Sequence, residues 1–302
     1  MSASSPILVI ENGRLLDVAA GRYGDQRNIA IRDGRILGFD HRWDPRDPDV
    51  RTFDARGGAV IPGLIDSHVH PAFCSLDMRS QELSSASYVA ILTAENLSAM
   101  LLRGFTTVRD LGGVDFGIVR AVEEGHIRGP RTFFCGRILS QTGGHGDLRE
   151  RGFLGSGTGT VAYPVSHIVD GTTEVRRAAR QELRLGADHI KVAVSGGVGS
   201  PTDRVDSLQY SDAEVSAIVD EARMANRYVA AHAYTAQAVN RALSLGVRSI
   251  EHGNFIDDES IGLFLAHDAF YVPTLVTYDK MHAHGPEFGL PEESGPKLDG
   301  MI

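Results

Sequence analysis

Residues 61–70 read Ile-Pro-Gly-Leu-Ile-Asp-Ser-His-Val-His, and this stretch decides the fold. An apolar run from Val60 to Ile65 is followed by two histidines, His68 and His70, two positions apart. Side chains at i and i+2 of a β-strand lie on the same face, so both imidazoles are expected to point the same way. Two neutral imidazoles at a strand end suit a divalent transition metal such as zinc. The stretch therefore predicts a strand that carries part of a metal site.

A strand–helix alternation continues from this segment along most of the chain. The predicted strands are residues 60–65, 106–109, 131–137, 189–194, 228–233, 247–251 and 270–275. Helical patterns lie between most of them, and Ser211 followed by Glu214 is a capping box that opens one of these helices. Buried strands that alternate with helices imply a parallel sheet, and seven in one run favour an α/β fold of the (β/α)8 TIM-like barrel type.

Two domains are expected. Residues 1–59 contain short β-rich runs with the hairpin signals Asn12-Gly13 and Asp33-Gly34, which predicts the N-terminal part of a small β-sandwich domain. Residues 60–302 form the predicted barrel domain. Only seven strand patterns occur in it, so we expect it to be truncated before strand 8.

The composition excludes several classes of partner. The chain has 302 residues and a net charge of −9, which argues against a surface for nucleic acid or for an anionic membrane. No apolar run is long enough to span a bilayer, and the N-terminus lacks the basic region of a signal peptide. Cys74 and Cys135 lie far apart and predict no disulfide framework, so a reducing, cytoplasmic location is expected. A homo-oligomer is left open.

Further candidate ligands stand at the ends of later strands, where the active sites of such barrels lie: Lys191, His232 and His252. Taken alone, a strand histidine is more often a hydrogen-bonded core residue than a ligand. A buried lysine needs an explanation, because an ammonium inside a barrel is expensive without a partner. It could pair with a carboxylate, form a Schiff base or be converted to an anion. Strand alternation predicts these pairs of residues on shared faces: Lys191 with Ala193, His232 with Ala230, and His252 with Ile250.

Together these motifs resemble the metal-dependent amidohydrolase superfamily over essentially the whole chain. The segments that carry the resemblance are 62–70, 190–192, 231–234 and 250–253. The resemblance implies a hydrolase with a binuclear centre of two divalent metal ions, zinc being the expected metal. It implies that His68 and His70 hold one ion, that His232 and His252 hold the other, and that Lys191, N6-carboxylated to a carbamate, bridges them.

The family also uses an aspartate at the end of strand 8, as a metal ligand and as the acid/base that moves protons. This aspartate has no counterpart here, since Asp279 follows strand 7 and Asp299 lies in a Gly/Pro-rich tail. We expect the chain to be a fragment or the first part of a split protein; impaired catalysis is the alternative.

Two features narrow the branch of the family. The segment 142–147, which contains His145, and Tyr234 resemble the branch of Xaa-Pro dipeptidases, small-peptide carboxypeptidases and the hydrolase that cleaves ochratoxin. By this analogy His145 and Tyr234 are catalytic and contact the scissile carbonyl or the substrate carboxylate. The simpler alternatives are a histidine that caps its Gly-rich turn and a tyrosine packed at a helix start. Arg149 and Arg204 are candidate clamps for the carboxylate.

The resemblance implies hydrolysis of an amide bond by a metal-bound hydroxide, in a dipeptide or N-acyl amino acid with a free carboxylate. One alternative is a cyclic-amide hydrolase or deaminase of the imidazolonepropionase type, although Lys191 counts against a mononuclear deaminase. An alternative of another class is a non-catalytic metal-binding fragment that needs a partner chain to complete the barrel.

Overall fold

The computed structural model describes residues 5–40, 43–44, 46–152 and 161–301. The chain divides into two compact units, Met1–Gly63 and Leu64–Ile302. The second unit contains all of the candidate site residues.

The N-terminal unit is a single five-stranded sheet. Its strands are β1 (Ile7–Asp17), β2 (Arg22–Arg32), β3 (Arg35–Phe39), β4 (Val50–Asp54) and β5 (Ala59–Val60), in the order β3-β2-β1-β4 with β5 beside β1. Asp33 and Gly34 form the predicted two-residue hairpin, and both have the positive φ of a type I′ turn, 51° and 71°. Asn12-Gly13 lies at a register shift inside β1 instead, so the hairpin predicted there is wrong. A second sheet that would complete a sandwich is absent from the described part of this unit.

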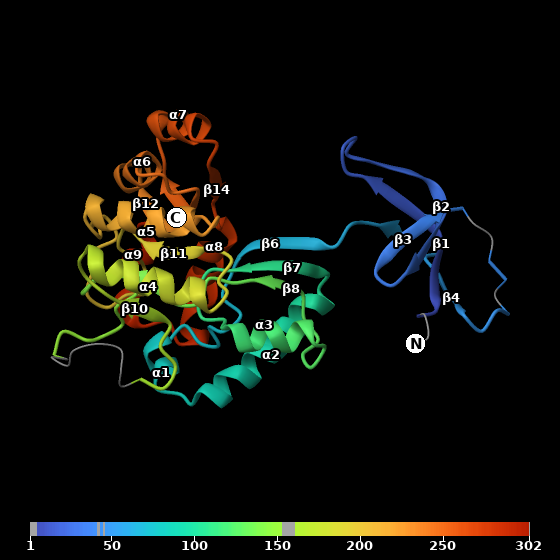
Figure 1. Cartoon of the computed structure of the whole chain (residues 1–302), viewed down its shortest axis with the longest axis horizontal. Helices are drawn as coiled ribbons and strands as arrows, with labels where there is room; N and C mark the ends of the chain where they lie inside the picture. The colour runs from blue at the N-terminus through green and yellow to red at the C-terminus, as the bar shows by residue number, and fades with distance from the viewer. Residues whose placement is uncertain (1–4, 41–42, 45, 153–160, 302) are drawn as a thin grey trace. The chain divides into compact units, whose positions relative to one another are not determined.

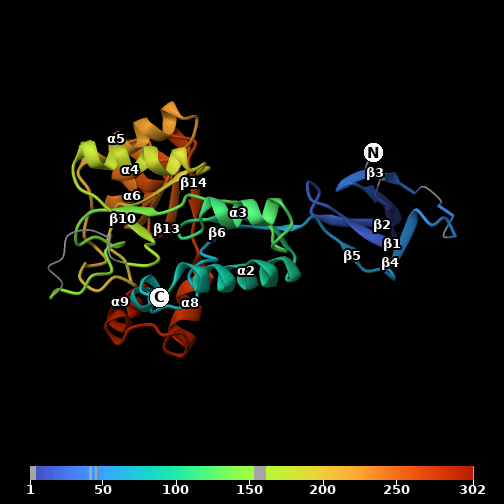
Figure 2. The same cartoon turned by 60° about the horizontal axis from the view of Figure 1, so that its bottom comes forward.

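The second unit is α/β with two parallel sheets, as the strand–helix alternation predicts (Figures 1 and 2). Three strands form the first sheet in the order β6-β7-β8, and six form the second in the order β10-β9-β11-β12-β13-β14. The strands are β6 (Leu64–Val69), β7 (Phe105–Asp110), β8 (Arg131–Phe133), β9 (Ile138–Ser140), β10 (Ser166–Ile168), β11 (Ile190–Ala193), β12 (Val229–Thr235), β13 (Ser249–Phe255) and β14 (Phe270–Val272). Within the described residues, the edge strands are β6 and β8 in the first sheet and β10 and β14 in the second, and each of them has a paired neighbour on one side only. The eight-stranded barrel stays a prediction.

Helices cover both sheets. The helices are α1 (Met78–Glu82), α2 (Ala86–Leu102), α3 (Phe116–Glu123), α4 (Thr172–Arg184), α5 (Asp212–Met224), α6 (Ala236–Ser244), α7 (Asp258–Ala266), α8 (Leu275–His284) and α9 (Gly295–Asp299), with 3-10 turns η1 (Gly285–Phe288) and η2 (Glu292–Ser294). Helices α2 and α3 lie beside the three-stranded sheet, and α4, α5 and α6 pack on β11 and β12 (Figures 1 and 2). In the described part of the chain, no helix is both long and apolar enough to cross a membrane.

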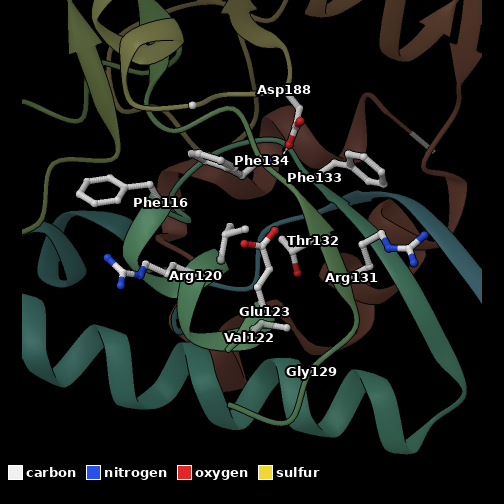
Figure 3. A pocket seen from close by; sticks show the side chains of 12 residues that line it. Phe116, Arg120, Val122, Glu123, Gly129, Arg131, Thr132, Phe133, Phe134 and Asp188 are labelled. Atoms are coloured by element: carbon white, nitrogen blue, oxygen red, sulfur yellow. Dashed lines mark hydrogen bonds between the residues drawn. The ribbon is translucent and has the colours of Figure 1, made fainter. Parts of the chain in front are cut away.

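The strand predicted at 131–137 ends early, and a separate short strand follows the predicted range. β8 ends at Phe133 and β9 begins at Ile138, and the intervening segment bends at Gly136, whose φ is +73°. A Cβ at Gly136 would overlap the carboxylate of the buried Glu182, so the bend needs glycine both for its conformation and for space. Beside β8 lies a surface cavity of about 580 Å³, lined by Phe116, Arg131 and other side chains (Figure 3).

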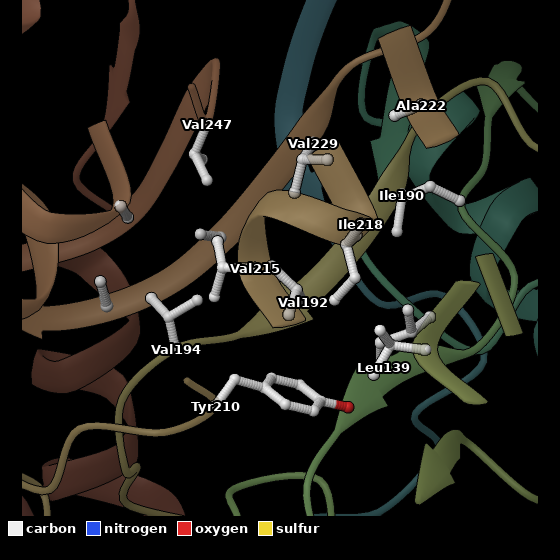
Figure 4. Close-up of a cluster of buried hydrophobic side chains, with 14 of the residues drawn as sticks. Leu139, Ile190, Val192, Val194, Tyr210, Val215, Ile218, Ala222, Val229 and Val247 are labelled. Carbon is white, nitrogen blue, oxygen red and sulfur yellow. The ribbon is translucent and has the colours of Figure 1, made fainter. Parts of the chain in front are cut away.

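The main core lies between the six-stranded sheet and its helices (Figure 4). Ile190 and Val192 of β11 pack there against Val215 and Ile218 of α5. Helix α5 begins at the predicted capping box, which is confirmed, because the Ser211 side chain accepts from the Glu214 N–H and the Glu214 carboxylate accepts from the Ser211 N–H. Since alternate residues fill the core, the remaining face of β11 turns away from the helices and carries Lys191.

Candidate metal centre

His68 and His70 face each other at the end of β6. His68 Nδ1 lies 2.8 Å from Glu251 Oε2, and His70 Nδ1 lies 3.2 Å from the carbonyl oxygen of Gly112. Both oxygens can only accept, so each Nδ1 carries the hydrogen and each neutral ring has a bare lone pair on Nε2. The two Nε2 atoms are 3.3 Å apart. Two lone pairs at this distance repel each other unless a cation lies against both.

Lys191 is buried in β11 with its ammonium end unpaired. Its side chain is 3% exposed, and Nζ has no hydrogen-bond partner among the described residues. Burial lowers the pKa of Lys191 to about 8, with the Glu251 carboxylate opposing that shift. Of the three explanations that the sequence left open for this lysine, a direct pair with a carboxylate is therefore not observed within the described chain.

His232 and His252 complete a row of ring contacts with the first pair. The centroid distances are 4.9 Å from His68 to His252 and 4.7 Å from His252 to His232. His232 Nε2 lies 3.0 Å from the carbonyl oxygen of Gly196, which fixes the hydrogen on Nε2 and leaves Nδ1 as the bare nitrogen. His252 Nδ1 lies 2.7 Å from Thr274 Oγ1. All four predicted histidines are thus brought together, each with one nitrogen held by an oxygen.

The backbone conformation of His252 differs from that of an ordinary strand residue. Ile250 belongs to the core beneath the helices, whereas Ser249 and Glu251 lie on the opposite face of β13. Simple alternation would put His252 on the face of Ile250, as predicted, and in the structure that face is turned toward the helices. The φ of His252 is +77°, a left-handed conformation that breaks the alternation and turns the ring into the site. The shared face predicted for His252 and Ile250 is therefore wrong, although the ring itself is placed with the other histidines.

Sequence reasoning missed the pair that supports His68. Glu251 is fully buried, and besides His68 it binds Arg109 of β7, with Arg109 Nη2 to Oε1 at 2.7 Å, and the hydroxyl of Ser249 at 2.6 Å. Arg109 also donates to the carbonyl oxygen of Ser67 at 2.6 Å. Glu251 thus fixes the tautomer of His68, and Arg109 offsets the charge of the buried carboxylate. The available signal was a carboxylate directly before His252, inside a strand predicted to be buried.

His145 lies beside the second pair of histidines. Its ring stacks on His232 with centroids 4.1 Å apart, and its Nδ1 lies 3.0 Å from the hydroxyl oxygen of Ser200. Burial lowers the pKa of His145 to about 4, which keeps the ring neutral near pH 7. Gly197 belongs to the loop after β11, which passes close to His145. A Cβ at this position would overlap the ring, so the close approach requires glycine there.

These side chains share one cavity of about 320 Å³. The four histidines, Lys191, His145 and Tyr234 all line it. Apolar side chains also line it, among them Met78, Leu148, Val198 and Met281. Tyr234 is 3% exposed, its ring lies 4.6 Å from that of His232, and burial raises its pKa to about 12.

The two arginines proposed as carboxylate clamps lie elsewhere. Arg149 pairs with Asp147 at 2.5 Å, and Arg204 pairs with Asp206 at 2.8 Å on the surface. Neither lines the cavity, and within the described residues its only lysine or arginine is Lys191. The larger cavity beside β8 contains none of the predicted site residues (Figure 3).

The donor set fits divalent metal ions only with help from Lys191. Among the described residues, no group of three or more His, Cys, Asp or Glu side chains is arranged to hold an ion by itself. The bare nitrogens of His68 and His70 supply two donors, and the unpaired Lys191 lies in the same cavity. A carbamate on Lys191 would add the anionic oxygens that a histidine pair lacks.

Comparison with known proteins gives a consistent result. The model of the amidohydrolase family matches residues 59–293. Ochratoxinase from Aspergillus niger is 35% identical over 260 residues, which cover 80% of this chain and 53% of that protein. The structure of a prolidase in complex with N-methylphosphonate-L-proline superposes with a TM-score of 0.92 at 45% identity, covering 98% of this chain and 72% of the other. The structure of a Xaa-Pro dipeptidase with bound methionine gives a TM-score of 0.82 at 30% identity, covering 98% and 73%.

The chain spans about half the length of the curated relatives that it matches. These relatives belong to the branch that the segment 142–147 and Tyr234 predict, which confirms that part of the sequence interpretation.

Proposed function

Because the chain belongs to the amidohydrolase family, we propose that it hydrolyses an amide bond in a dipeptide or N-acyl amino acid with a free carboxylate. We further propose that the reaction depends on two divalent metal ions, with zinc as the expected metal. The observation that carries this proposal is the pair of bare Nε2 atoms of His68 and His70, 3.3 Å apart in the cavity that Lys191 also lines. Such an arrangement is unfavourable without a cation and favourable with one.

In this proposal His68 and His70 would hold one ion, His232 and His252 would hold the other, and Lys191, as a carbamate, would supply oxygen ligands to both. The neutral amine of Lys191 attacks CO₂, a nitrogen–carbon bond forms, and one proton leaves, so the product carries one negative charge. A lysine with an ordinary pKa is almost entirely protonated near pH 7 and is a poor nucleophile. The lowered pKa of Lys191, about 8, supports the proposal because it raises the neutral fraction.

When bound, the ions would polarise the scissile carbonyl and lower the pKa of water at the site. The protein's own groups would orient the substrate. His145 and Tyr234 line the cavity on the side of His232 and are placed to contact the reacting amide. The apolar lining residues, including Met78 and Met281, would exclude water and accept an apolar part of the substrate.

We also propose that the two parallel sheets belong to one (β/α)8 barrel, closed by a further parallel strand between β14 and β6. Both strands have an open edge, and both expose apolar side chains: Ile65 of β6 is 69% exposed and Phe270 of β14 is 60% exposed. Open apolar edges are avoided in native sheets because they aggregate. The inserted strand would carry the aspartate that the family uses as acid and base.

The same open edges favour a second candidate function. The chain would then bind metal without turning over substrate, and hydrolysis would begin only when another polypeptide supplied the strand. The two candidates share the metal site and differ in whether the chain acts alone.

Metal analysis and a substrate panel test these proposals together. The purified chain, loaded with zinc in bicarbonate buffer, should bind about two ions, and Lys191→Ala should lose metal and activity together. Lys280→Ala, at an exposed lysine of α8, is the matched control and should keep both. A panel of Xaa-Pro dipeptides, Xaa-Arg dipeptides and N-acyl amino acids should be hydrolysed in preference to hydantoins and imidazolones.

Each outcome separates the alternatives. One ion per chain, or full activity in Lys191→Ala, would rule out the bridged pair. Turnover of the cyclic substrates alone would replace the proposed reaction by that of a cyclic-amide hydrolase. Two ions without turnover of any substrate would support the second candidate.

A further inference from the structure

The loop after β11 carries a carboxylate that the proposed reaction does not use. Asp203 has a side chain that is only 3% exposed, yet it lies in an irregular segment between β11 and α5. A buried charge in a loop is expensive unless several donors surround it. The contacts of Asp203 therefore indicate what the residue does.

Four donors converge on this carboxylate. Oδ1 accepts from the Ser200 hydroxyl and from Lys297 Nζ at 3.1 Å. Oδ2 accepts from Gln209 Nε2 at 2.9 Å and from the Gly197 N–H at 3.2 Å. Each oxygen of the carboxylate thus accepts two hydrogen bonds, which replace the water that the buried group has lost.

Two of these donors connect Asp203 to His145. The Ser200 hydroxyl oxygen lies 3.0 Å from His145 Nδ1, so Ser200 links the carboxylate to the ring. Gln209 uses its other end, Oε1, to accept from the His145 N–H at 2.8 Å, so it links the carboxylate to the backbone. His145 is thus held at two points by side chains that both depend on Asp203.

Counting hydrogens along the first link fixes the tautomer of His145. A hydroxyl has one hydrogen, and the closest acceptor to Ser200 Oγ is the Asp203 carboxylate. Ser200 therefore presents a lone pair to His145 Nδ1, and that nitrogen must carry the hydrogen. The opposite tautomer would require Ser200 to donate to His145, leaving the hydroxyl oxygen against a carboxylate with no hydrogen between them.

We propose that Asp203 is a positioning residue that acts through Ser200 to hold His145 as the Nδ1–H tautomer, with Nε2 as a bare acceptor. This proposal rests on the proposed function for its catalytic consequence. The neutral ring then offers the substrate a hydrogen-bond acceptor and not a donor. The donor toward a developing oxyanion would be the hydroxyl of Tyr234, which lines the same cavity.

Lys297 of α9 extends this arrangement to the C-terminal part of the described chain. Besides Asp203, its Nζ donates to the carbonyl oxygens of Gly197 at 3.0 Å and Ser200 at 2.7 Å. Both of these residues lie against the His145 ring. Lys297 therefore neutralises Asp203 and clamps the loop at the positions that determine where His145 lies.

The tautomer can be measured without any turnover. Histidine labelled with ¹⁵N in the metal-free protein gives separate signals for protonated and bare ring nitrogens, and His145→Gln assigns the signal of interest. Wild type should show His145 protonated at Nδ1. Ser200→Ala and Asp203→Asn should shift His145 toward the Nε2–H form, while Ser207→Ala, a serine of the same loop that donates to the Arg204 carbonyl oxygen, should leave it unchanged.

Activity then separates positioning from a general loss of structure. Ser200→Ala and Asp203→Asn should each lower kcat by about 10- to 100-fold at unchanged zinc content. In a His145→Ala background neither change should lower kcat further, because both act through that ring. An equal loss in that background, or an Nε2–H signal in wild type, would overturn the proposal. The tautomer is read even if no substrate is hydrolysed, so failure of the proposed function is distinguished from failure of this inference.

Discussion

Replacement of Glu251 by glutamine tests the support of the candidate metal centre most directly. Glutamine keeps the size of the side chain and removes its charge. In the wild type the carboxylate is fully buried, accepts from Arg109 Nη2 at 2.7 Å and faces His68 Nδ1 at 2.8 Å. Glu251→Gln should therefore affect both the fold, through Arg109, and the metal site, through His68.

The magnitudes follow from burial. Arg109 is 15% exposed, so in the variant its guanidinium loses a carboxylate partner that is shielded from water. Breaking a buried ion pair lowers the free energy of unfolding by about 3–5 kcal/mol. Arg109 retains its bonds to Ser249 and to the carbonyl oxygen of Ser67, which places the expected loss near the lower end, about 3 kcal/mol. Loss of the carboxylate behind a metal-binding histidine weakens metal affinity by about 10- to 100-fold.

Two measurements check these values. Urea unfolding of the metal-free protein gives the stability change, and competition with a chelator gives zinc affinity. The control is the exposed pair Arg120–Glu124, 72% and 44% exposed, where Glu124→Gln should cost less than about 1 kcal/mol and leave zinc affinity unchanged. The double variant Arg109→Met/Glu251→Gln should be less destabilised than the sum of its single variants. If Glu251→Gln matched the exposed control in both assays, the role assigned to this pair would be refuted.

Three further predictions concern the neutral state of the buried groups and the space around His145. Lys191→Met should stabilise the metal-free protein by about 3 kcal/mol at pH 7, since the folded pKa of about 8 lies below the ordinary 10.5. The stability of the wild type should approach that of the variant as the pH rises from 8 to 10.5. A constant difference in stability over that range would contradict this reasoning. Burial lowers the pKa of His189 from 6.5 to about 3, so the stability of wild type should fall by up to about 5 kcal/mol as the pH drops through that range. In urea unfolding from pH 7 to 4, His189→Phe should lose less stability than the wild type does. His126→Phe, at an exposed site, should show the same fall as the wild type. Gly197→Ala should displace the His145 ring and lower kcat at least tenfold at unchanged zinc content. Gly262→Ala, in α7 with open space around the added Cβ, should keep near-normal activity. Equal kcat values for the two variants would show that the ring tolerates the added methyl group.

The sequence predicts the class of fold and most of the site because both depend on local patterns. Strand alternation places Lys191 and His232 correctly, and the Ser211 cap marks where α5 begins. Strand alternation does not predict the side on which His252 lies, because its ring position depends on a positive φ at that residue. Periodicity cannot reveal such a conformation.

Contacts between distant segments could not be predicted from the sequence for a different reason. Glu251 meets Arg109 across 142 residues, and Lys297 meets Asp203 across 94. Each partner alone reads as an ordinary charged residue of a strand, loop or helix. Only the fold shows that these charges are buried together. The family resemblance identifies metal ligands and does not identify the groups that orient them.

The loop after β11, which lies against His145, is attached to α9, and this gives the two halves of the site different local stabilities. His68 lies within a strand paired to β7, while the loop at Gly197 is held by a lysine on a five-residue helix. Short helices open at a small free-energy cost, so α9 is expected to detach before the sheet does. Amide exchange at Gly197 should then be much faster than at Val69, and His145 would lose its orientation in an opened state that keeps His68 and His70 together.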